Sequence, residues 1–329
     1  MARPVGTTAG VGAPGNAQRA SLPRRLLAYQ AERFPLVGFV PLITLFTVAS
    51  AAFSRNARHA PGTVSATLLA VGSFTSLVCF FLLRVLDEHK DAEDDRRFRP
   101  ELPVPRGLVT LAELRAVGTA AGATALLLNA LVAPVMLLPL VLVAAWATLM
   151  TREFFVRDWL RAHASAYLVT HMAIMPLIDG YTTGLDWLPA GRHPPVGVLW
   201  FLGVTFANGV LIEIGRKLRA PADERTGVDT YTHVWGPRLA PSVWLCALAA
   251  STWLSVRAAQ HVGWPGGAYD LFVVLAAAAG APALWFLGSQ RRGAARAVEH
   301  VSQAWPALTY LSLGVLPLVA RVLGVADGR

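Results

Sequence analysis

Long apolar stretches alternate with short polar segments along most of the chain. Each stretch is close to the roughly 20 residues that an α-helix needs to cross a bilayer. The prolines within them are compatible with membrane helices, because neighbouring helices can satisfy the freed carbonyl groups. The pattern predicts nine membrane-spanning helices, at residues 35–53, 64–86, 116–132, 133–151, 164–181, 195–214, 240–261, 268–288 and 303–324.

These spans predict the fold class and the domain organisation. We expect an all-α integral membrane bundle of about nine transmembrane helices, forming one domain over residues 28–329. Residues 1–27 are rich in Gly, Ala, Pro and Arg and have no hydrophobic period, so they are predicted to form a flexible tail. Of the 329 residues, 54% are hydrophobic and only 15% are charged. Soluble domains carry about a quarter charged residues, so a large soluble domain, a disordered protein and a collagen-like fibre are excluded.

The net charge of +9 has two possible explanations, binding of nucleic acid or the positive-inside asymmetry of membrane proteins. With the N-terminus in the cytoplasm and nine spans, most of the 29 Lys and Arg residues fall in cytoplasmic segments. This distribution favours a multi-pass protein of the cell membrane, in contact with the lipid bilayer and without a nucleic-acid partner. The opposite side receives Arg55, Arg58, Arg192, Arg321 and Arg329.

The acidic residues form two clusters, both expected on the cytoplasmic side. The first follows the second predicted span and contains Asp87, Asp91 and Asp95 at four-residue spacing. On a continuing helix these carboxylates advance about 40° and roughly 6 Å per step, so they form one stripe. Like charges at this spacing repel, and Mg²⁺ neutralises them by binding one or two carboxylates together with phosphate oxygens and water. We interpret the stripe as a Mg²⁺ site for a diphosphate; a solvated charged loop is the alternative.

The second cluster follows the sixth predicted span. Glu213 and Lys217 are an i,i+4 pair, which taken alone indicates a helical salt bridge. Pro221 is expected to end the helix, and Asp223 follows it in a loop that can fold over the same site. Metal-type carboxylates therefore stand beside guanidinium groups suited to phosphate. These guanidinium groups belong to Arg216, Arg219 and Arg225.

At the first cluster the sequence resembles the UbiA superfamily of intramembrane prenyltransferases, which have nine transmembrane helices and two aspartate-rich motifs after helices two and six. The family's first motif is NDxxDxxxD, followed by a basic, proline-containing stretch. Asp87-Glu88-x-x-Asp91-x-x-x-Asp95 and the following residues 96–107 match it closely. Asp87 replaces the usual Asn, and Glu88 replaces the adjacent Asp.

The second cluster resembles the family's second motif only in part. Asp223 and Gly227 match its DxxxGxxTLP type of ending. The earlier aspartates are missing: Arg219 stands where one is expected, and Glu213 with Lys217 are candidate substitutes. The resemblance covers nearly the whole chain after the tail, and this departure indicates a divergent branch.

The resemblance implies an enzyme that ionises a prenyl diphosphate and transfers the prenyl group to an unidentified lipophilic acceptor. The prenyl chain is expected in a lateral, lipid-accessible cavity. By the same resemblance, Mg²⁺ is expected between the two motifs, and its implied ligands are Asp87, Asp91, Asp95, Glu213 and Asp223. The implied catalytic residues are Asp87, Asp91, Asp95 and Lys217, and the candidate diphosphate-binding residues are Arg84, Arg97, Arg99, Arg157, Asn208, Arg216, Lys217 and Arg225.

Two other functions stay open at this point. A terpene cyclase on the same scaffold would ionise the diphosphate and quench the cation internally, without an acceptor. A transporter would be expected to show inverted repeats, broken helices and ionisable residues at mid-membrane. The sequence shows no such repeat, and its carboxylates cluster at the edge of the spans.

Overall fold

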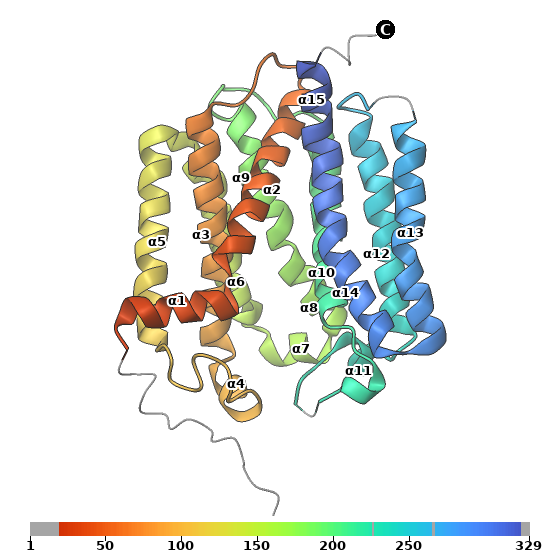
Figure 1. Cartoon of the computed structure of the whole chain (residues 1–329). Helices are drawn as coiled ribbons and strands as arrows, with labels where there is room; N and C mark the ends of the chain where they lie inside the picture. Colours follow the sequence, from red (N-terminus) through yellow and green to blue (C-terminus); the bar gives the residue numbers. More distant parts are fainter. Residues whose placement is uncertain (1–19, 226, 265–266, 324–329) are drawn as a thin grey trace, which may run out of the picture.

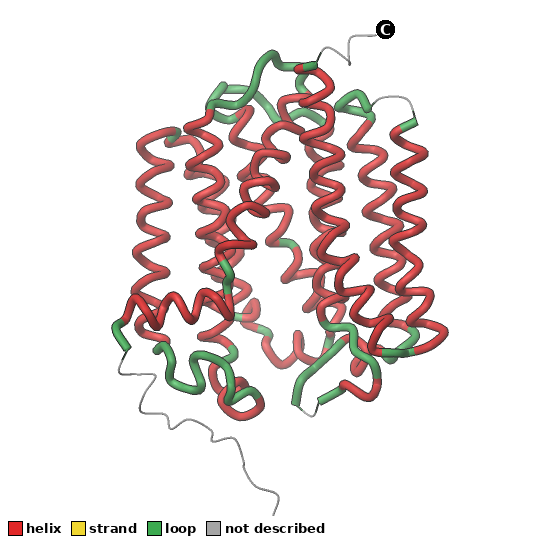
Figure 2. Tube along the Cα trace, viewed as in Figure 1, coloured by secondary structure: helices red, strands yellow, loops and turns green. Residues whose placement is uncertain are grey.

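The computed structural model describes residues 20–225, 227–264 and 267–323. Over these ranges the chain is helical without a strand (Figures 1 and 2), which confirms the predicted all-α bundle. The α-helices are α1 (Leu22–Arg33), α2 (Leu36–Ala57), α3 (Ala66–Lys90), α4 (Ala92–Phe98), α5 (Leu111–Val132), α6 (Leu137–Thr151), α7 (Arg157–Ala162), α8 (Ala164–Met172), α9 (Ile174–Trp187), α10 (Gly197–Arg216), α11 (Tyr231–Trp235), α12 (Leu239–Ala259), α13 (Ala268–Ser289), α14 (Arg292–Tyr310) and α15 (Leu316–Val322). Short helical turns are η1 (Pro134–Met136), η2 (Glu153–Phe155), η3 (Pro221–Asp223) and η4 (Leu311–Val315).

Eight helices in the described part of the chain are long and apolar enough to cross a membrane. They correspond to eight of the nine expected spans, with α14, η4 and α15 forming the last one. The remaining span, expected at 164–181, divides at Ala173 into α8 and α9. Pro176 favours a break at this place, because its ring clashes with the carbonyl group four residues earlier, at Met172, where α8 ends.

Helix α1 begins inside the segment predicted as a tail, at Leu22. It runs across the end of the bundle rather than along it (Figure 1), and its Arg25 pairs with Glu113 at the start of α5. Residues 22–27 are therefore helical, contrary to the prediction, and residues 1–19 of the predicted tail lie outside the described residues. Residues 1–27 show no hydrophobic period because the apolar face of α1 spans only a few positions around Leu26 and Tyr29.

Helix α10 lies in the largest hydrophobic core, where Leu211, Ile214 and Trp244 are fully buried. Near its end, Gly215 allows α14 to approach closely, since a Cβ atom there would lie 1.9 Å from the Ser302 hydroxyl. That hydroxyl accepts a hydrogen bond from the Trp244 indole at 2.8 Å. The contact fixes the end of α10, which carries the second acidic cluster.

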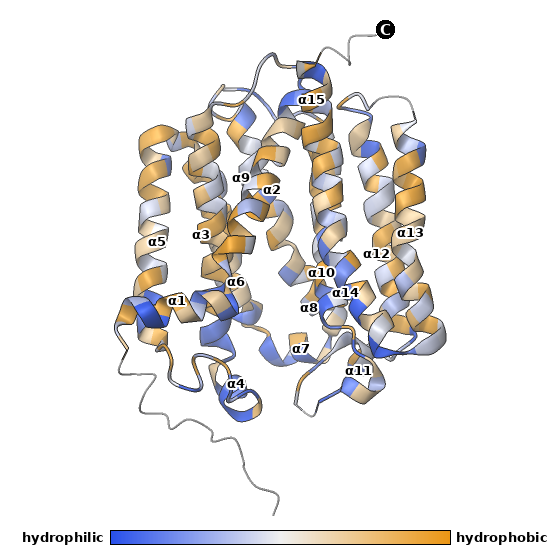
Figure 3. Cartoon of the chain, viewed as in Figure 1, coloured by the Kyte–Doolittle hydropathy of each residue, from blue (hydrophilic) through white to orange (hydrophobic). Residues whose placement is uncertain are grey.

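Both acidic clusters lie at one end of the bundle, together with α1, α4, α7 and α11 (Figure 1). Hydrophilic residues are concentrated at the two ends, and the long helices between them are mostly hydrophobic (Figure 3). The chain is thus built as a multi-pass membrane protein. That the N-terminus and both clusters face the cytoplasm stays a prediction from the positive-inside rule.

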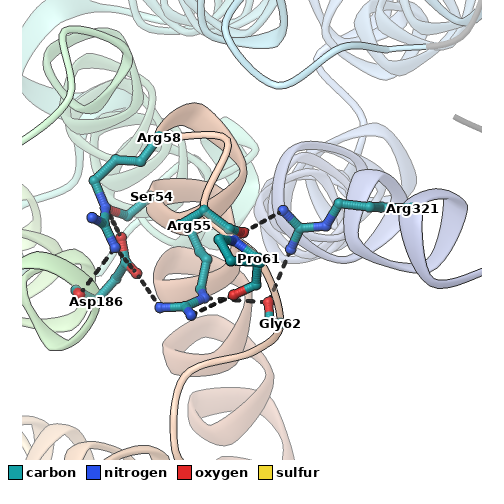
Figure 4. Close-up of polar contacts among 8 residues, drawn as sticks. Ser54, Arg55, Arg58, Pro61, Gly62, Asp186 and Arg321 are labelled. Atoms are coloured by element: carbon teal, nitrogen blue, oxygen red, sulfur yellow. Dashed lines mark hydrogen bonds and ion pairs between the residues drawn. The ribbon is translucent and has the colours of Figure 1, made fainter. Parts of the chain in front are cut away.

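At the opposite end of the bundle, the buried carboxylate of Asp186 joins α9 to α2 (Figure 4). The guanidinium group of Arg58 donates to both of its oxygens at 2.7 Å, and Arg55 and Ser54 donate at 3.1 and 2.9 Å. Arg321 reaches the same end and donates to the carbonyl groups of the loop after α2. Arg55, Arg58 and Arg321 thus lie opposite the acidic clusters, as the charge distribution predicted.

Candidate functional site

The first acidic cluster does not continue as one helix. Helix α3 ends at Lys90, Asp91 has non-helical backbone angles, and α4 begins at Ala92 in a new direction. The expected stripe of three carboxylates is therefore wrong: Asp87 lies on α3, Asp91 at the junction, and Asp95 on α4. The four-residue spacing gave no sign of this turn.

Two carboxylates of the first motif, Asp95 and Glu88, pair with arginines. Asp95 is buried and pairs with Arg99 at 3.1 Å, and burial raises the pKa of its carboxyl group while the Arg99 charge opposes this. Glu88 is buried too; it accepts from Arg33 at 2.7 Å and from the Tyr29 hydroxyl at 3.4 Å. Glu88 therefore joins α1 to the first motif.

Four side chains from four elements meet between the two motifs, and we call them the lysine–tyrosine cluster: Lys90 (α3), Tyr167 (α8), Lys217 (after α10) and Tyr231 (α11). Lys90 Nζ donates to the Tyr167 hydroxyl at 2.9 Å. Lys217 Nζ lies 5.8 Å from the ring centroids of both tyrosines. Burial raises the pKa of the Tyr231 hydroxyl, so it stays protonated and can donate to an anion. The two lysines are the only ones in the sequence.

Carboxylates surround this cluster. Glu213 is buried and pairs with Lys217 at 2.9 Å and with Arg216 at 2.6 Å. Asp87 is exposed. Its carboxyl group experiences the positive charges of Arg84, Lys90 and Arg216 and the negative charge of Asp91. Cations and carboxylates of both motifs are thus interleaved in one place, which is what a diphosphate-binding site requires.

The turn after α6 supplies a carboxylate that the sequence analysis missed. Glu153, Phe154 and Phe155 all have positive φ angles, between 46° and 61°, a conformation that costs energy for residues other than glycine. This turn brings Glu153 to within 3.7 Å of Lys90 and 3.5 Å of Arg157. Such strain is concentrated at functional sites in proteins.

His171 is held beside the lysine–tyrosine cluster. Its ring stacks on Tyr167 with centroids 3.7 Å apart, and its Nδ1 contacts the Tyr167 carbonyl oxygen at 2.9 Å. Its buried Nε2 has no hydrogen-bond partner among the described residues. A narrow pocket is lined by His171, Asp87 and Lys90. The imidazole is therefore oriented through one nitrogen, leaving the other for a ligand.

The narrow pocket adjoins a large apolar cavity between α3, α5 and α6. The two share the lining residues Leu83, Leu86, Ala147 and Thr151. The cavity has a volume of about 640 Å³ and extends along α3 to Thr75. From Leu86 to Thr75 this is about 16 Å at 1.5 Å per residue. A charged site therefore stands at one end of an apolar channel.

Several residues predicted to bind the diphosphate or the metal ion lie away from the lysine–tyrosine cluster. Arg97 is exposed over the Phe98 ring, and Asn208 is buried between Thr309 and Ser251, hydrogen-bonded to each at 2.8 Å. Asp223 pairs with Arg292 at 2.7 Å. A separate polar pocket of about 700 Å³ contains Asp223 together with Arg99, Arg219 and Arg225. Of the candidates, Arg216 and Lys217 lie at the cluster, and Arg157 reaches it through Glu153. The charge of Arg84 acts on Asp87, one turn further along α3.

Solved structures share this architecture. A structure from a study of digeranylgeranylglyceryl phosphate synthase in membranes matches with a TM-score of 0.61 and 13% identity, covering 89% of this chain and 99% of that one. The apo structure of a UbiA homologue from Aeropyrum pernix K1 matches with a TM-score of 0.62 and 14% identity, covering 85% and 98%. The chain has the UbiA fold. No protein-family model matches the sequence, and no curated protein matches it.

The UbiA resemblance implied Mg²⁺, and the side chains fit it at one motif only. In the described part of the chain, no three His, Cys, Asp or Glu side chains come together as a metal-binding group. Asp87 and Asp91 fit an ion that takes one or two carboxylates plus phosphate oxygens and water. Glu213 and Asp223 do not, because Lys217, Arg216 and Arg292 already neutralise them.

Proposed function

We propose that this UbiA-fold protein is a membrane prenyltransferase, which ionises a prenyl diphosphate and transfers the prenyl group to a lipophilic acceptor. The observation that carries the proposal is the meeting of cations from both motifs at Tyr167, at the end of an apolar channel. The amphiphilic substrate matches this arrangement: its diphosphate requires the charged end and its isoprenoid chain the apolar one.

Ionisation breaks the allylic C–O bond, and the electron pair leaves with the diphosphate. Lys90, Arg216 and Lys217 are positioned to stabilise the charge that develops on the departing oxygen. When bound at Asp87 and Asp91, Mg²⁺ adds Lewis-acid neutralisation of the same charge. The break leaves an allylic cation on the prenyl chain.

The cation is next quenched by the acceptor. A nucleophilic carbon or oxygen of the acceptor forms a bond to the allylic carbon and releases one proton. His171 lies at the pocket beside Asp87 and Lys90, and its Nε2, which has no hydrogen-bond partner among the described residues, is the group that takes this proton. In a cyclase the new bond would form within the prenyl chain, and the same nitrogen would take the proton.

The test is incubation of the purified protein with geranyl, farnesyl or geranylgeranyl diphosphate and Mg²⁺, with and without a membrane lipid extract as the acceptor source. Prenylated lipid, detected by mass spectrometry and dependent on the extract, is the expected result. A cyclised hydrocarbon or alcohol without extract would identify the cyclase instead. Consumption of none of the three diphosphates under either condition would contradict both enzymes.

Narrowing the apolar cavity is expected to shorten the preferred substrate. Gly122 lines the cavity, and its Cβ position lies 3.6 Å from Leu82, about midway along it. In Gly122→Phe, kcat/KM for geranylgeranyl diphosphate should fall at least about tenfold, the scale on which one misfitting apolar group discriminates. The value for geranyl diphosphate should stay within about twofold.

Ala120→Phe is the matched control, because Ala120 is exposed on the same helix and outside the cavity lining. It should change neither value. Equal losses for long and short substrates in Gly122→Phe would mean that the prenyl chain lies elsewhere.

A further inference from the structure

The second acidic cluster is neutralised by the chain's own cations. Glu213, only 4% exposed, has Lys217 and Arg216 at 2.9 and 2.6 Å. Asp223 lies in the separate polar pocket with Arg292. A divalent ion at this motif would have to displace two cations from a buried carboxylate, which is costly because these cations would then be left without their partner.

Lys217 is the cation that faces the site. Its Nζ lies between the rings of Tyr167 and Tyr231, and its backbone carbonyl accepts from the Tyr231 amide at 3.2 Å. An ammonium group has three donors, of which Glu213 takes one. Within the described residues the two others have no hydrogen-bond partner, so they can donate to phosphate oxygens, and the side chain is about one-third exposed.

Arg216 adds a second donor group beside it. Its guanidinium group is half exposed while it pairs with Glu213, and its charge also acts on Asp87 of the first motif. The two motifs are therefore bridged by fixed cations. Arg216 and Lys217 carry two positive charges against the single negative charge of Glu213, so the group keeps a net positive charge for a diphosphate.

We infer that the site binds diphosphate with a single divalent cation, held at Asp87 and Asp91, and that Lys217 and Arg216 bind the diphosphate directly at the second motif. This inference rests on the proposed function for its physiological ligand. It predicts a site with one metal ion. At the second motif, Lys217 and Arg216 hold the diphosphate in place of a second ion, and we call these two side chains the cation clamp.

The metal count is the first test. The full-length protein in detergent is titrated with Mn²⁺ in the presence and absence of inorganic diphosphate, and the diphosphate-dependent Mn²⁺ is counted by electron paramagnetic resonance. One such ion per chain is expected. Two or more would overturn the inference.

The affinity for inorganic diphosphate is the second test, measured by calorimetry at saturating Mn²⁺. Lys217→Ala should weaken binding by about 10- to 100-fold, the range of one hydrogen bond to a charged group. Lys217→Arg should retain most of the affinity. Arg296→Ala, an exposed arginine of the separate polar pocket, controls for the loss of one positive charge and should bind normally. Unchanged affinity in Lys217→Ala would overturn the inference.

The two proposals fail separately. Inorganic diphosphate needs neither an acceptor nor turnover, so a chain that consumes no prenyl diphosphate can still give the expected metal count and affinities. Conversely, prenyl transfer with two diphosphate-dependent ions would leave the proposed function standing and remove the cation clamp.

Discussion

Asp91→Ala is expected to lose at least about 100-fold in kcat, the scale on which removal of one group that stabilises developing charge acts. Asp91 stands at the junction of α3 and α4, partly exposed, and with Asp87 it is the proposed carboxylate pair for Mg²⁺. The fold should persist, because Asp91 makes no side-chain cap to α4. Turnover of prenyl diphosphate, together with circular dichroism of the same sample, measures both effects.

Asp94→Ala is the matched control on the neighbouring helix. Asp94 pairs with Arg161 at 3.2 Å, and both side chains are about half exposed, so the pair is worth only about 0–1 kcal/mol. Its turnover should be close to that of the unmodified protein. Near-normal turnover in Asp91→Ala would remove the metal site from the proposed mechanism.

The spans could be predicted from the sequence because the bilayer imposes a length and an apolar composition on each helix. Their interruptions could not. Pro176 was visible in the sequence, yet proline inside a membrane helix is tolerated when neighbours satisfy the freed carbonyl group, so the break at Ala173 depends on packing. Helix α1 was missed for a related reason: it lies across the bundle, where only one face is apolar.

The two acidic clusters were predicted, whereas their partners were not. Nothing in the sequence pattern indicates that Lys90 and Tyr167 meet. Their contact joins α3 to α8, elements about 77 positions apart in the chain. The spacing of residues predicts which side chains are neighbours on one helix. It does not predict which faces of two different helices come into contact.

A buried acid in α9 was also missed. Asp179 accepts hydrogen bonds from Ser50, Thr182 and Tyr310 at 3.0, 3.2 and 2.5 Å. An ionisable residue inside a span is by default a functional suspect, and here its bonds join α2, α9 and α14. Because three hydroxyl groups satisfy this carboxylate, its contacts account for it as a helix-packing group rather than a transport site.

Asp186→Ala is expected to lower the free energy of unfolding by about 3 kcal/mol, the low end of the range for removing one partner of a buried ion pair. The low end applies because Arg55 and Arg58 are about one-fifth exposed and can recover some hydration. Arg55 also keeps its bonds to the carbonyl groups of Pro61 and Gly62 (Figure 4). Unfolding in mixed detergent and SDS micelles, followed by circular dichroism, measures the change.

Arg55 and Arg58 differ in their other partners, and this difference predicts how Arg58→Ala compares with Asp186→Ala in its effect on the free energy of unfolding. Among the described residues, the side chain of Arg58 donates hydrogen bonds only to Asp186. Arg58→Ala therefore removes one cation but leaves Asp186 paired with Arg55, and it should cost less than Asp186→Ala. Asp270→Ala, an exposed aspartate in the first turn of α13, should cost less than about 1 kcal/mol. If Asp186→Ala were no more destabilising than Asp270→Ala, the end of the bundle opposite the acidic clusters would be held by helix packing alone. The charged groups there would then be dispensable to the fold.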